Sequence, residues 1–297
     1  MAGYIDAMRS TLAELLGERD TATPGLFDGL PAAARPVVDD AIAELIIYQG
    51  PGYAQLYLDR LRRFVGRRGV DEELLIEIAR LMLMRMCFED PIRIAQLTLA
   101  EAGVPKKGRA ARPLDRTCRF RLDELVSALP TMAADPLLSA IGYVGWLHAP
   151  VRMRFNATSF LGICRLRVES WLRRWRLLSV RYPQERAWVE RWLHMIDRSL
   201  TKQPRAVGQI VQSATLVQGY GALYRQGLAD WHLIIDQLAK PTFDGTLPLT
   251  DLAGAIVDAR AASRPDPQQS ALKARIAEIR ALAFEQAPPG VAAGRPG

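Results

Sequence analysis

The stretch RYPQERAWVERWLHMIDRSL, residues 181–200, shows most clearly the pattern on which the fold assignment rests. Its apolar side chains recur every three or four residues, which is the period of an amphipathic α-helix, whereas a half-buried strand would alternate every two. Trp188, Trp192 and Ile196 share one face of such a helix. We therefore predict a helix over residues 183–200.

The same period extends along nearly the whole chain, so the sequence predicts an all-α protein of about ten helices. Asp71 and Asp90 are suited to cap two of them, because an aspartate oxygen accepts a hydrogen bond from a free amide of the first helical turn. A third helical stretch, residues 37–65, is interrupted at Pro51, which lacks the amide that a helix needs there. Other helices are expected over residues 4–16, 159–178, 207–239, 249–261 and 270–284.

We expect at most one short β element, near residues 106–122 or 150–156. The alternation of residues 117–122 favours a strand there, and residues 150–156 are expected to be irregular. The chain then divides into four parts: an N-terminal helix and loop extension (1–38), a main helical domain (39–240), C-terminal helices (241–286) and a tail (287–297). The tail is too rich in Pro, Gly and Ala to fold alone.

Composition excludes several classes of protein. Of the 297 residues 49% are hydrophobic, enough for a sizeable core, yet no apolar run reaches the length of a membrane span. Three scattered cysteines argue against a disulfide framework and against a metal or iron–sulfur site. No known catalytic motif is present, so we predict no catalytic residues, no metal ligands and no cofactor held by this chain. These features indicate a soluble cytoplasmic protein without a membrane partner.

Positive charge is concentrated in one segment. Between residues 152 and 191 there are ten arginines and three acidic residues, a balance equal to the chain's whole net charge of +7. Such a block suits a nucleic acid, an anionic ligand or an acidic partner surface, and an ordinary solvated helix face is the alternative. Our candidate residues for docking a partner are Arg173, Arg174, Arg176, Arg181, Arg186 and Arg191.

Four tryptophans lie in the same segment as two pairs, Trp171 with Trp175 and Trp188 with Trp192. Each pair is four residues apart and so falls on one helix face. We expect the two faces to pack together as an antiparallel hairpin, with Trp175 and Trp192 buried. An exposed aromatic platform for nucleic-acid bases is the alternative.

Several short motifs in this chain resemble one known family. They are Thr158-Ser159-Phe160-Leu161-Gly162, Leu172-Arg173-Arg174-Trp175-Arg176, Glu190-Arg191-Trp192-Leu193 and Leu216-Val217-Gln218-Gly219-Tyr220-Gly221 with Gly227. In order and spacing they resemble the C-terminal helical region of the beta subunit of indolepyruvate:ferredoxin oxidoreductase. Earlier matches, such as Ile42-Ala43-Glu44-Leu45 and Phe88-Glu89-Asp90, extend the resemblance over residues 39–238.

The resemblance implies a fold and a setting. That family decarboxylates aryl 2-oxoacids oxidatively with thiamine diphosphate and iron–sulfur clusters, and holds those cofactors mainly in other subunits or domains. The resemblance therefore implies a non-catalytic accessory subunit, or a diverged relative of one, that docks onto a larger oxidoreductase subunit carrying the cofactors. A basic helical nucleic-acid-binding protein and a scaffold, including a homo-oligomer, are the alternatives.

One motif departs from the family pattern. The family's glycine motif usually reads Lys-Gly-Tyr-Gly-Asp-Thr, followed by an Arg-Gly pair. This chain keeps Gly219, Tyr220, Gly221 and Gly227 but has uncharged residues at the four remaining positions, namely Gln218, Ala222, Leu223 and Gln226. Glycines serve backbone geometry and close packing, so we expect Gly219, Tyr220, Gly221 and Gly227 to have a structural role.

Overall fold

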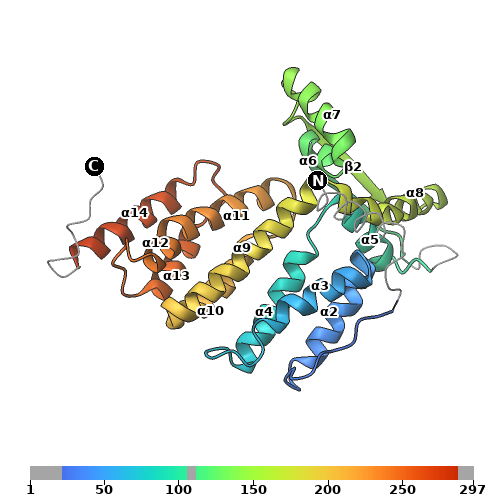
Figure 1. Ribbon diagram of the computed structural model, residues 1–297. Helices are drawn as coiled ribbons and strands as arrows, with labels where there is room; N and C mark the ends of the chain where they lie inside the picture. The colour runs from blue at the N-terminus through green and yellow to red at the C-terminus, as the bar shows by residue number, and fades with distance from the viewer. Residues whose placement is uncertain (1–21, 106–111, 287–297) are drawn as a thin grey trace, which may run out of the picture. The chain divides into compact units, whose positions relative to one another are not determined.

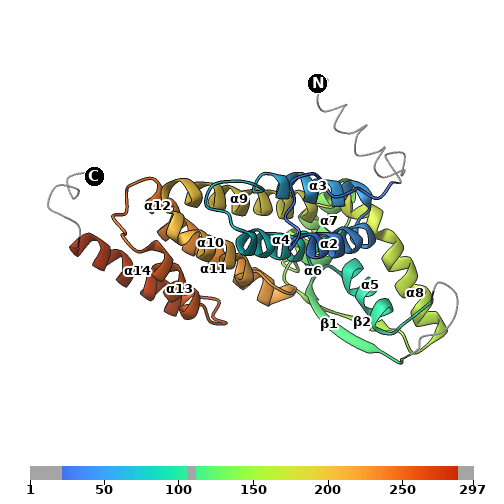
Figure 2. The ribbon, with the colours of Figure 1, turned by 90° about the horizontal axis from the view of Figure 1, so that it is seen from below.

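The computed structural model describes residues 22–105 and 112–286 (Figure 1). The described chain is mostly helical, with one two-stranded antiparallel sheet, which confirms the predicted fold class (Figure 2). The predicted helix at residues 4–16 and the predicted tail at 287–297 lie outside the described residues.

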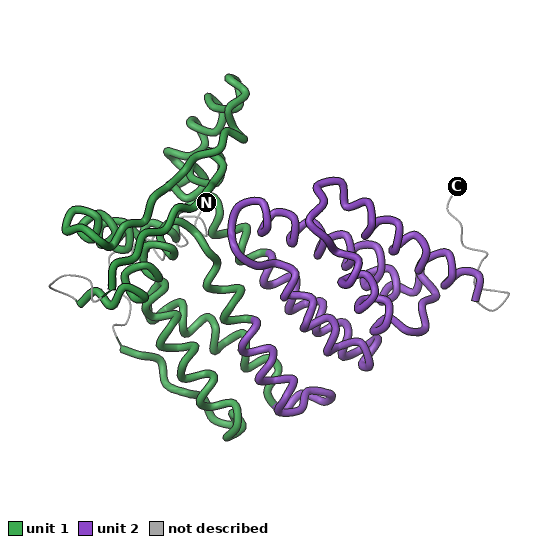
Figure 3. The backbone as a smooth tube through the Cα atoms, turned by 180° about the vertical axis from the view of Figure 1, so that it is seen from behind, with its two compact units in different colours: residues 1–65, 82–187 green, residues 66–81, 188–297 purple. Residues whose placement is uncertain are grey.

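The chain forms two compact units, each built from two separate segments (Figure 3). Unit 1 consists of residues 1–65 and 82–187, and unit 2 of residues 66–81 and 188–297. Helices α4 (Glu72–Met86) and α9 (Arg181–Lys202) contribute residues to both. The other helices of unit 1 are α2 (Arg35–Tyr48), α3 (Pro51–Arg62), α5 (Pro91–Glu101), α6 (Leu122–Ser127), α7 (Thr131–Tyr143) and α8 (Phe160–Trp171).

Helix boundaries in unit 1 follow local signals. The Asp90 carboxylate accepts a hydrogen bond from the Arg93 amide at 2.6 Å and so caps α5. The break between α2 and α3 falls at Gly50, whose φ of 134° is open only to glycine, and Pro51 then begins α3. The two helices contact each other, and both bury apolar side chains, among them Leu45 of α2 and Leu58 of α3.

The sheet pairs β1 (Asp115–Arg121) with β2 (Pro150–Asn156) in antiparallel register. The strand expected at residues 117–122 is confirmed, but the expectation that residues 150–156 are irregular is wrong. Cys118, Phe120 and Phe155 are buried on the inner face, against α5 and α8. Residues 150–156 become a strand because β1 satisfies their backbone groups, and that partner lies 35 residues earlier in the chain.

The predicted helix at residues 159–178 changes type partway. Helix α8 ends at Trp171, and residues 172–178 form a 3₁₀ helix, η1 (Leu172–Leu178). A 3₁₀ helix has 3.0 residues per turn, so residues four apart no longer share a face. As a result Trp171 and Trp175 are 62% and 44% exposed. The prediction that Trp175 is buried is wrong.

Unit 2 contains α10 (Val207–Gln212), α11 (Gly221–Ile234), α12 (Lys240–Phe243), α13 (Leu252–Ala262) and α14 (Ser270–Glu285). The single helix predicted over residues 207–239 is instead broken between α10 and α11. Gly219 and Gly221 have positive φ values of 70° and 64°, which end the helical path, and Tyr220 lies extended between them. A short π-helix, η4 (Ile235–Ala239), follows α11.

Three tryptophans form the aromatic centre of unit 2. The rings of Trp188 and Trp192 stack at 6.4 Å between centroids, and Trp231 meets Trp188 edge-on at 5.0 Å. Trp192 is fully buried, as predicted, and its indole N–H donates to the Ile210 carbonyl at 3.2 Å. The partner of this aromatic pair is therefore Trp231 of α11, and the predicted pairing with Trp171 and Trp175 is wrong.

Gly227 allows α11 to lie directly against the backbone that precedes it. A Cβ at this position would overlap the carbonyl oxygen of Leu216, which is main chain and cannot rotate away. We expect Gly227→Ala to destabilise the protein by about 3 kcal/mol or more, at the upper end of overpacking costs. Urea unfolding followed by circular dichroism measures it.

Gly208→Ala is the matched control for this prediction. Gly208 lies inside α10, and a Cβ there would meet nothing within 4 Å. Because alanine favours a helix over glycine, this variant should be as stable as the parent or slightly more so. Equal stability of the two variants would contradict the packing role of Gly227.

Candidate functional site

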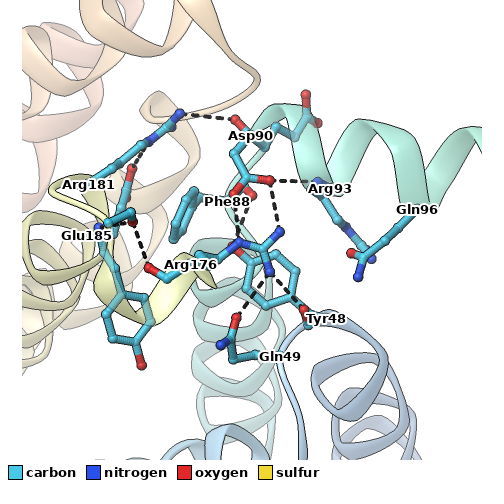
Figure 4. Close-up of polar contacts among 12 residues, drawn as sticks. Tyr48, Gln49, Phe88, Asp90, Arg93, Gln96, Arg176, Arg181 and Glu185 are labelled. Atoms are coloured by element: carbon cyan, nitrogen blue, oxygen red, sulfur yellow. Dashed lines mark hydrogen bonds and ion pairs between the residues drawn. The ribbon is translucent and has the colours of Figure 1, made fainter. Parts of the chain in front are cut away.

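The arginines predicted to dock a partner lie mostly inside unit 1 or against its own backbone, and Arg176 is the clearest case (Figure 4). Its side chain is 1% exposed. The guanidinium donates to both carboxylate oxygens of Asp90, at 2.6 and 2.9 Å, and to the Tyr48 carbonyl at 2.8 Å. It also lies 3.9 Å above the Tyr48 ring. The prediction that Arg176 docks a partner is wrong, because its donors are used within the fold.

Asp90 connects three elements at this point. Its carboxylate caps α5, while the Arg176 that it binds comes from η1 and holds the end of α2 through Tyr48. Burial alone would lower the pKa of Arg176, but the neighbouring Asp90 carboxylate raises it, and the net pKa is above the ordinary value. Arg176 therefore stays charged, and the buried ion pair is a structural clamp.

A second buried carboxylate lies beside the first pair. Glu185 accepts from Arg85 at 3.2 Å. It also accepts from Arg181 at 3.0 Å (Figure 4). Arg181 also donates to the Glu89 carbonyl at 3.3 Å. The side chains of Arg85 and Glu185 are both 3% exposed. Arg181, a predicted docking residue, thus serves mainly to hold α9 in unit 1.

The remaining predicted docking arginines differ in accessibility. Arg173 donates to the Ile47 carbonyl at 2.7 Å, and Arg191 binds Asp236 and His232 in unit 2. Arg186 is exposed and lies over the Tyr182 ring at 5.7 Å. The side chain of Arg174 lies outside the described part of the structure. Of the six, only Arg186 is described as an exposed side chain, so these residues do not form one charged surface.

Reactive side chains near the clamp are not poised for chemistry. Burial raises the pKa of the Cys87 thiol to about 12, so it is not a thiolate at neutral pH. Burial likewise raises the pKa of Tyr48 and of Tyr53. Within residues 22–105 and 112–286 no group of three or more His, Cys, Asp or Glu side chains could hold a metal ion.

The most unusual surface of the described chain is apolar. We call residues 129–147, which comprise α7 and its flanking loops, the arm. Met132 and Tyr143 are 94% and 96% exposed, and Trp146 is 63% exposed. Leu129, Leu137 and Val144 are exposed as well, and Ala134 is the one described residue of α7 that is buried. In Figure 1 α7 extends away from the other helices of unit 1.

A second exposed apolar surface lies on α8. Phe160, Leu161 and Val168 are exposed, as is Trp171 at the end of the helix. Large apolar patches are uncommon on proteins that act alone, and Tyr, Trp and Met are enriched where proteins meet. These two apolar surfaces are therefore the best candidates for a protein-docking site, and the arm, with the most exposed side chains, is the stronger of the two.

Sequence reasoning missed the arm, although a signal was present. Residues 125–147 contain a single charged residue, Asp135. A surface helix usually has a charged face, whereas a helix without one is buried or awaits a partner. Because a charged docking surface was expected, the arginines were predicted in place of this apolar segment.

A groove of about 450 Å³ lies between α11 and α14 in unit 2. Leu233, Ile276 and Phe284 line it. The two cations at its rim are bound to backbone carbonyls, Lys273 to Gln268 and Arg280 to Gln237. Since those polar groups are already used, the groove is a weaker candidate than the arm.

Within the described residues no helix is both long and apolar enough to cross a membrane. No curated protein and no solved structure shows significant similarity to the chain. One family model matches residues 34–237, more than two thirds of the sequence and most of the helices described above. The chain therefore belongs to the family of unknown function DUF6537.

Proposed function

We propose that this chain is a non-catalytic helical accessory subunit whose arm docks onto a larger protein. The observation that carries the proposal is the exposed apolar surface of the arm. Burying apolar area yields roughly 25 cal/mol per Å², so a helix with almost no buried side chain gains most of its packing energy from a partner. The alternative is an ordinary surface helix that faces solvent. Such a helix would have a charged outer face, which α7 lacks.

The proposed partner is the cofactor-bearing subunit of a thiamine-dependent 2-oxoacid:ferredoxin oxidoreductase-like complex. This part of the proposal is supported by the resemblance of residues 39–238 to the helical region of the indolepyruvate:ferredoxin oxidoreductase beta subunit. Thiamine diphosphate and iron–sulfur clusters would then be held by the partner, and the site of action would be the cytoplasm. The buried clamp around Asp90 and Arg176 would hold η1 in place, and the Leu178 carbonyl of η1 accepts a hydrogen bond from Thr131 at the start of α7.

The test is co-purification of the tagged chain from its native host. We expect it to isolate a larger chain that carries iron and thiamine diphosphate, identified by mass spectrometry and metal analysis. The triple variant Met132→Ser, Tyr143→Ser, Trp146→Ser should lose that chain while keeping its circular dichroism spectrum, because all three side chains are exposed.

Leu223→Ser with Val257→Ser is the matched control. These are exposed apolar residues of unit 2, outside the arm, and we expect the double variant to retain the partner. A partner without thiamine diphosphate would refute the oxidoreductase assignment and leave docking intact. Full retention of the partner by a folded triple variant would refute docking through the arm.

A further inference from the structure

The outward face of the β1–β2 sheet brings four arginines together. In the register of the sheet Arg119 lies directly opposite Arg152. Arg154 is one outward position away on one side, and Arg121 on the other. The inner face of the sheet is covered by α5 and α8, so this outward face is the accessible one. In Figure 2 the two strands lie along one edge of unit 1.

The two outer arginines are neutralised within the sheet region. Arg154 donates to both carboxylate oxygens of Asp115, at 2.9 Å from its Nε. This contact lowers the pKa of Asp115 through the hydrogen bond, so the carboxylate stays charged. Arg121 pairs with Asp123, with 3.0 Å between its Nε and a carboxylate oxygen.

The central pair is different. Arg119 and Arg152 are both exposed, and neither has an ion-pair or hydrogen-bond partner among the described residues. Side chains directly opposite each other in an antiparallel sheet have Cβ atoms about 4.5–5.5 Å apart, and like charges in such a pair are destabilising. The repulsion between Arg119 and Arg152 therefore destabilises the sheet locally, and a bound anion would relieve this repulsion.

The other outward side chains of the sheet indicate which kind of anion would bind there. Its other outward side chains include Thr117 and Pro150, and none is aromatic or a large aliphatic. The core of a protein–protein interface is enriched in aromatic residues and depleted of charge, which describes the arm and not this face. A polyanion with charges along its length fits better, since outward positions repeat about every 6.8 Å along a strand. A two-stranded ribbon also fits the major groove of a duplex.

We propose that the outward face of the β1–β2 sheet binds the phosphodiester backbone of nucleic acid, with Arg119 and Arg152 as its phosphate ligands. Phosphate contacts position a protein without reading sequence, so the binding is sequence-independent. This inference goes beyond docking through the arm. Its test uses the purified full chain, and its outcome does not depend on whether the arm has a partner.

The test is fluorescence anisotropy with a labelled 20-base-pair duplex between about 50 and 200 mM salt. The logarithm of the association constant falls linearly with the logarithm of salt, by about 0.9 per phosphate neutralised. The double variant Arg119→Thr, Arg152→Thr should therefore bind more weakly, with a slope smaller by about 2, for two unrelated duplex sequences alike. Threonine keeps the strand propensity of both positions.

The matched control is Arg68→Thr with Arg205→Thr. Both arginines are exposed, lie outside the sheet and have no partner among the described residues, so this variant removes the same charge. Its slope should equal that of the parent. An equal change in both double variants would show that only net charge matters and would overturn the proposal.

A single variant separates binding from structure. Arg119→Glu places a carboxylate opposite Arg152, so it should raise the melting temperature while weakening binding to the duplex. An unchanged slope in the threonine variant would overturn the proposal. So would aggregation of that variant without loss of binding, since the arginines would then protect open strand edges. Tighter binding of poly-L-glutamate than of the duplex, compared at equal charge, would assign the face to an acidic protein instead.

Discussion

Trp192→Ala should destabilise the protein by about 3–5 kcal/mol, the range for truncating a large aromatic side chain in a core. Trp192 is fully buried, stacks on Trp188 and uses its indole N–H on the Ile210 carbonyl. Truncation would therefore leave a cavity in unit 2 and remove one donor from the Ile210 carbonyl, which keeps its hydrogen bond from the Ser213 hydroxyl. Urea unfolding followed by tryptophan fluorescence and circular dichroism measures the loss.

Trp175→Ala is the control from the same segment of sequence. The side chain of Trp175 is 44% exposed on η1, so much of its surface already faces water. We expect a change of less than about 1 kcal/mol, as for other surface substitutions. If the Trp175 variant unfolds as readily as the Trp192 variant, the assignment of the aromatic centre to Trp188, Trp192 and Trp231 is wrong.

Arg176→Met should also lower the free energy of unfolding, by about 3–5 kcal/mol. Removing one partner of a buried ion pair leaves the other charge uncompensated, here the Asp90 carboxylate, which is 2% exposed. The double variant Arg176→Met, Asp90→Asn removes both charges and retains a capping residue at position 90, so it should recover part of the loss.

Arg116→Met supplies the comparison for an exposed pair. Arg116 and Glu101 are 2.7 Å apart, and their side chains are 35% and 48% exposed. Water screens such a pair, so its loss should cost less than about 1 kcal/mol. Melting curves of Arg176→Met, of the double variant and of Arg116→Met, recorded with that of the parent, measure the loss of stability in each. An Arg176→Met protein as stable as the Arg116→Met protein would show that the clamp is not a stability element.

Helix positions were predictable because their signals are local. Asp90 caps α5 through an amide three residues away, and Pro51 begins α3 directly after a glycine turn. The change from α8 to η1 was not predictable, because residues 159–178 keep a helical period throughout. In the resulting 3₁₀ helix Trp175 is exposed and Arg176 binds Asp90.

Other features could not be predicted because they depend on contacts between residues that are far apart in the sequence. Arg176 meets a carboxylate 86 residues earlier, and β2 pairs with a strand 35 residues earlier. Neither partner can be identified from spacing in one sequence. The arm could not be predicted for a different reason. A helix with a single charged residue can be a buried core helix or an exposed helix that binds a partner, and the sequence pattern is the same for both.

The buried pair of Asp90 and Arg176 also bears on the order in which the chain is made. Asp90 leaves the ribosome 86 residues before Arg176, which at about 5–20 residues per second is a delay of about 4–17 s. Throughout that interval the carboxylate has no counter-ion, so α2 and α5 cannot close around it without burying a lone charge. Unit 1 therefore completes its core only after η1 has been translated, and nascent chains that stop short of residue 176 expose apolar surface to chaperones and proteases.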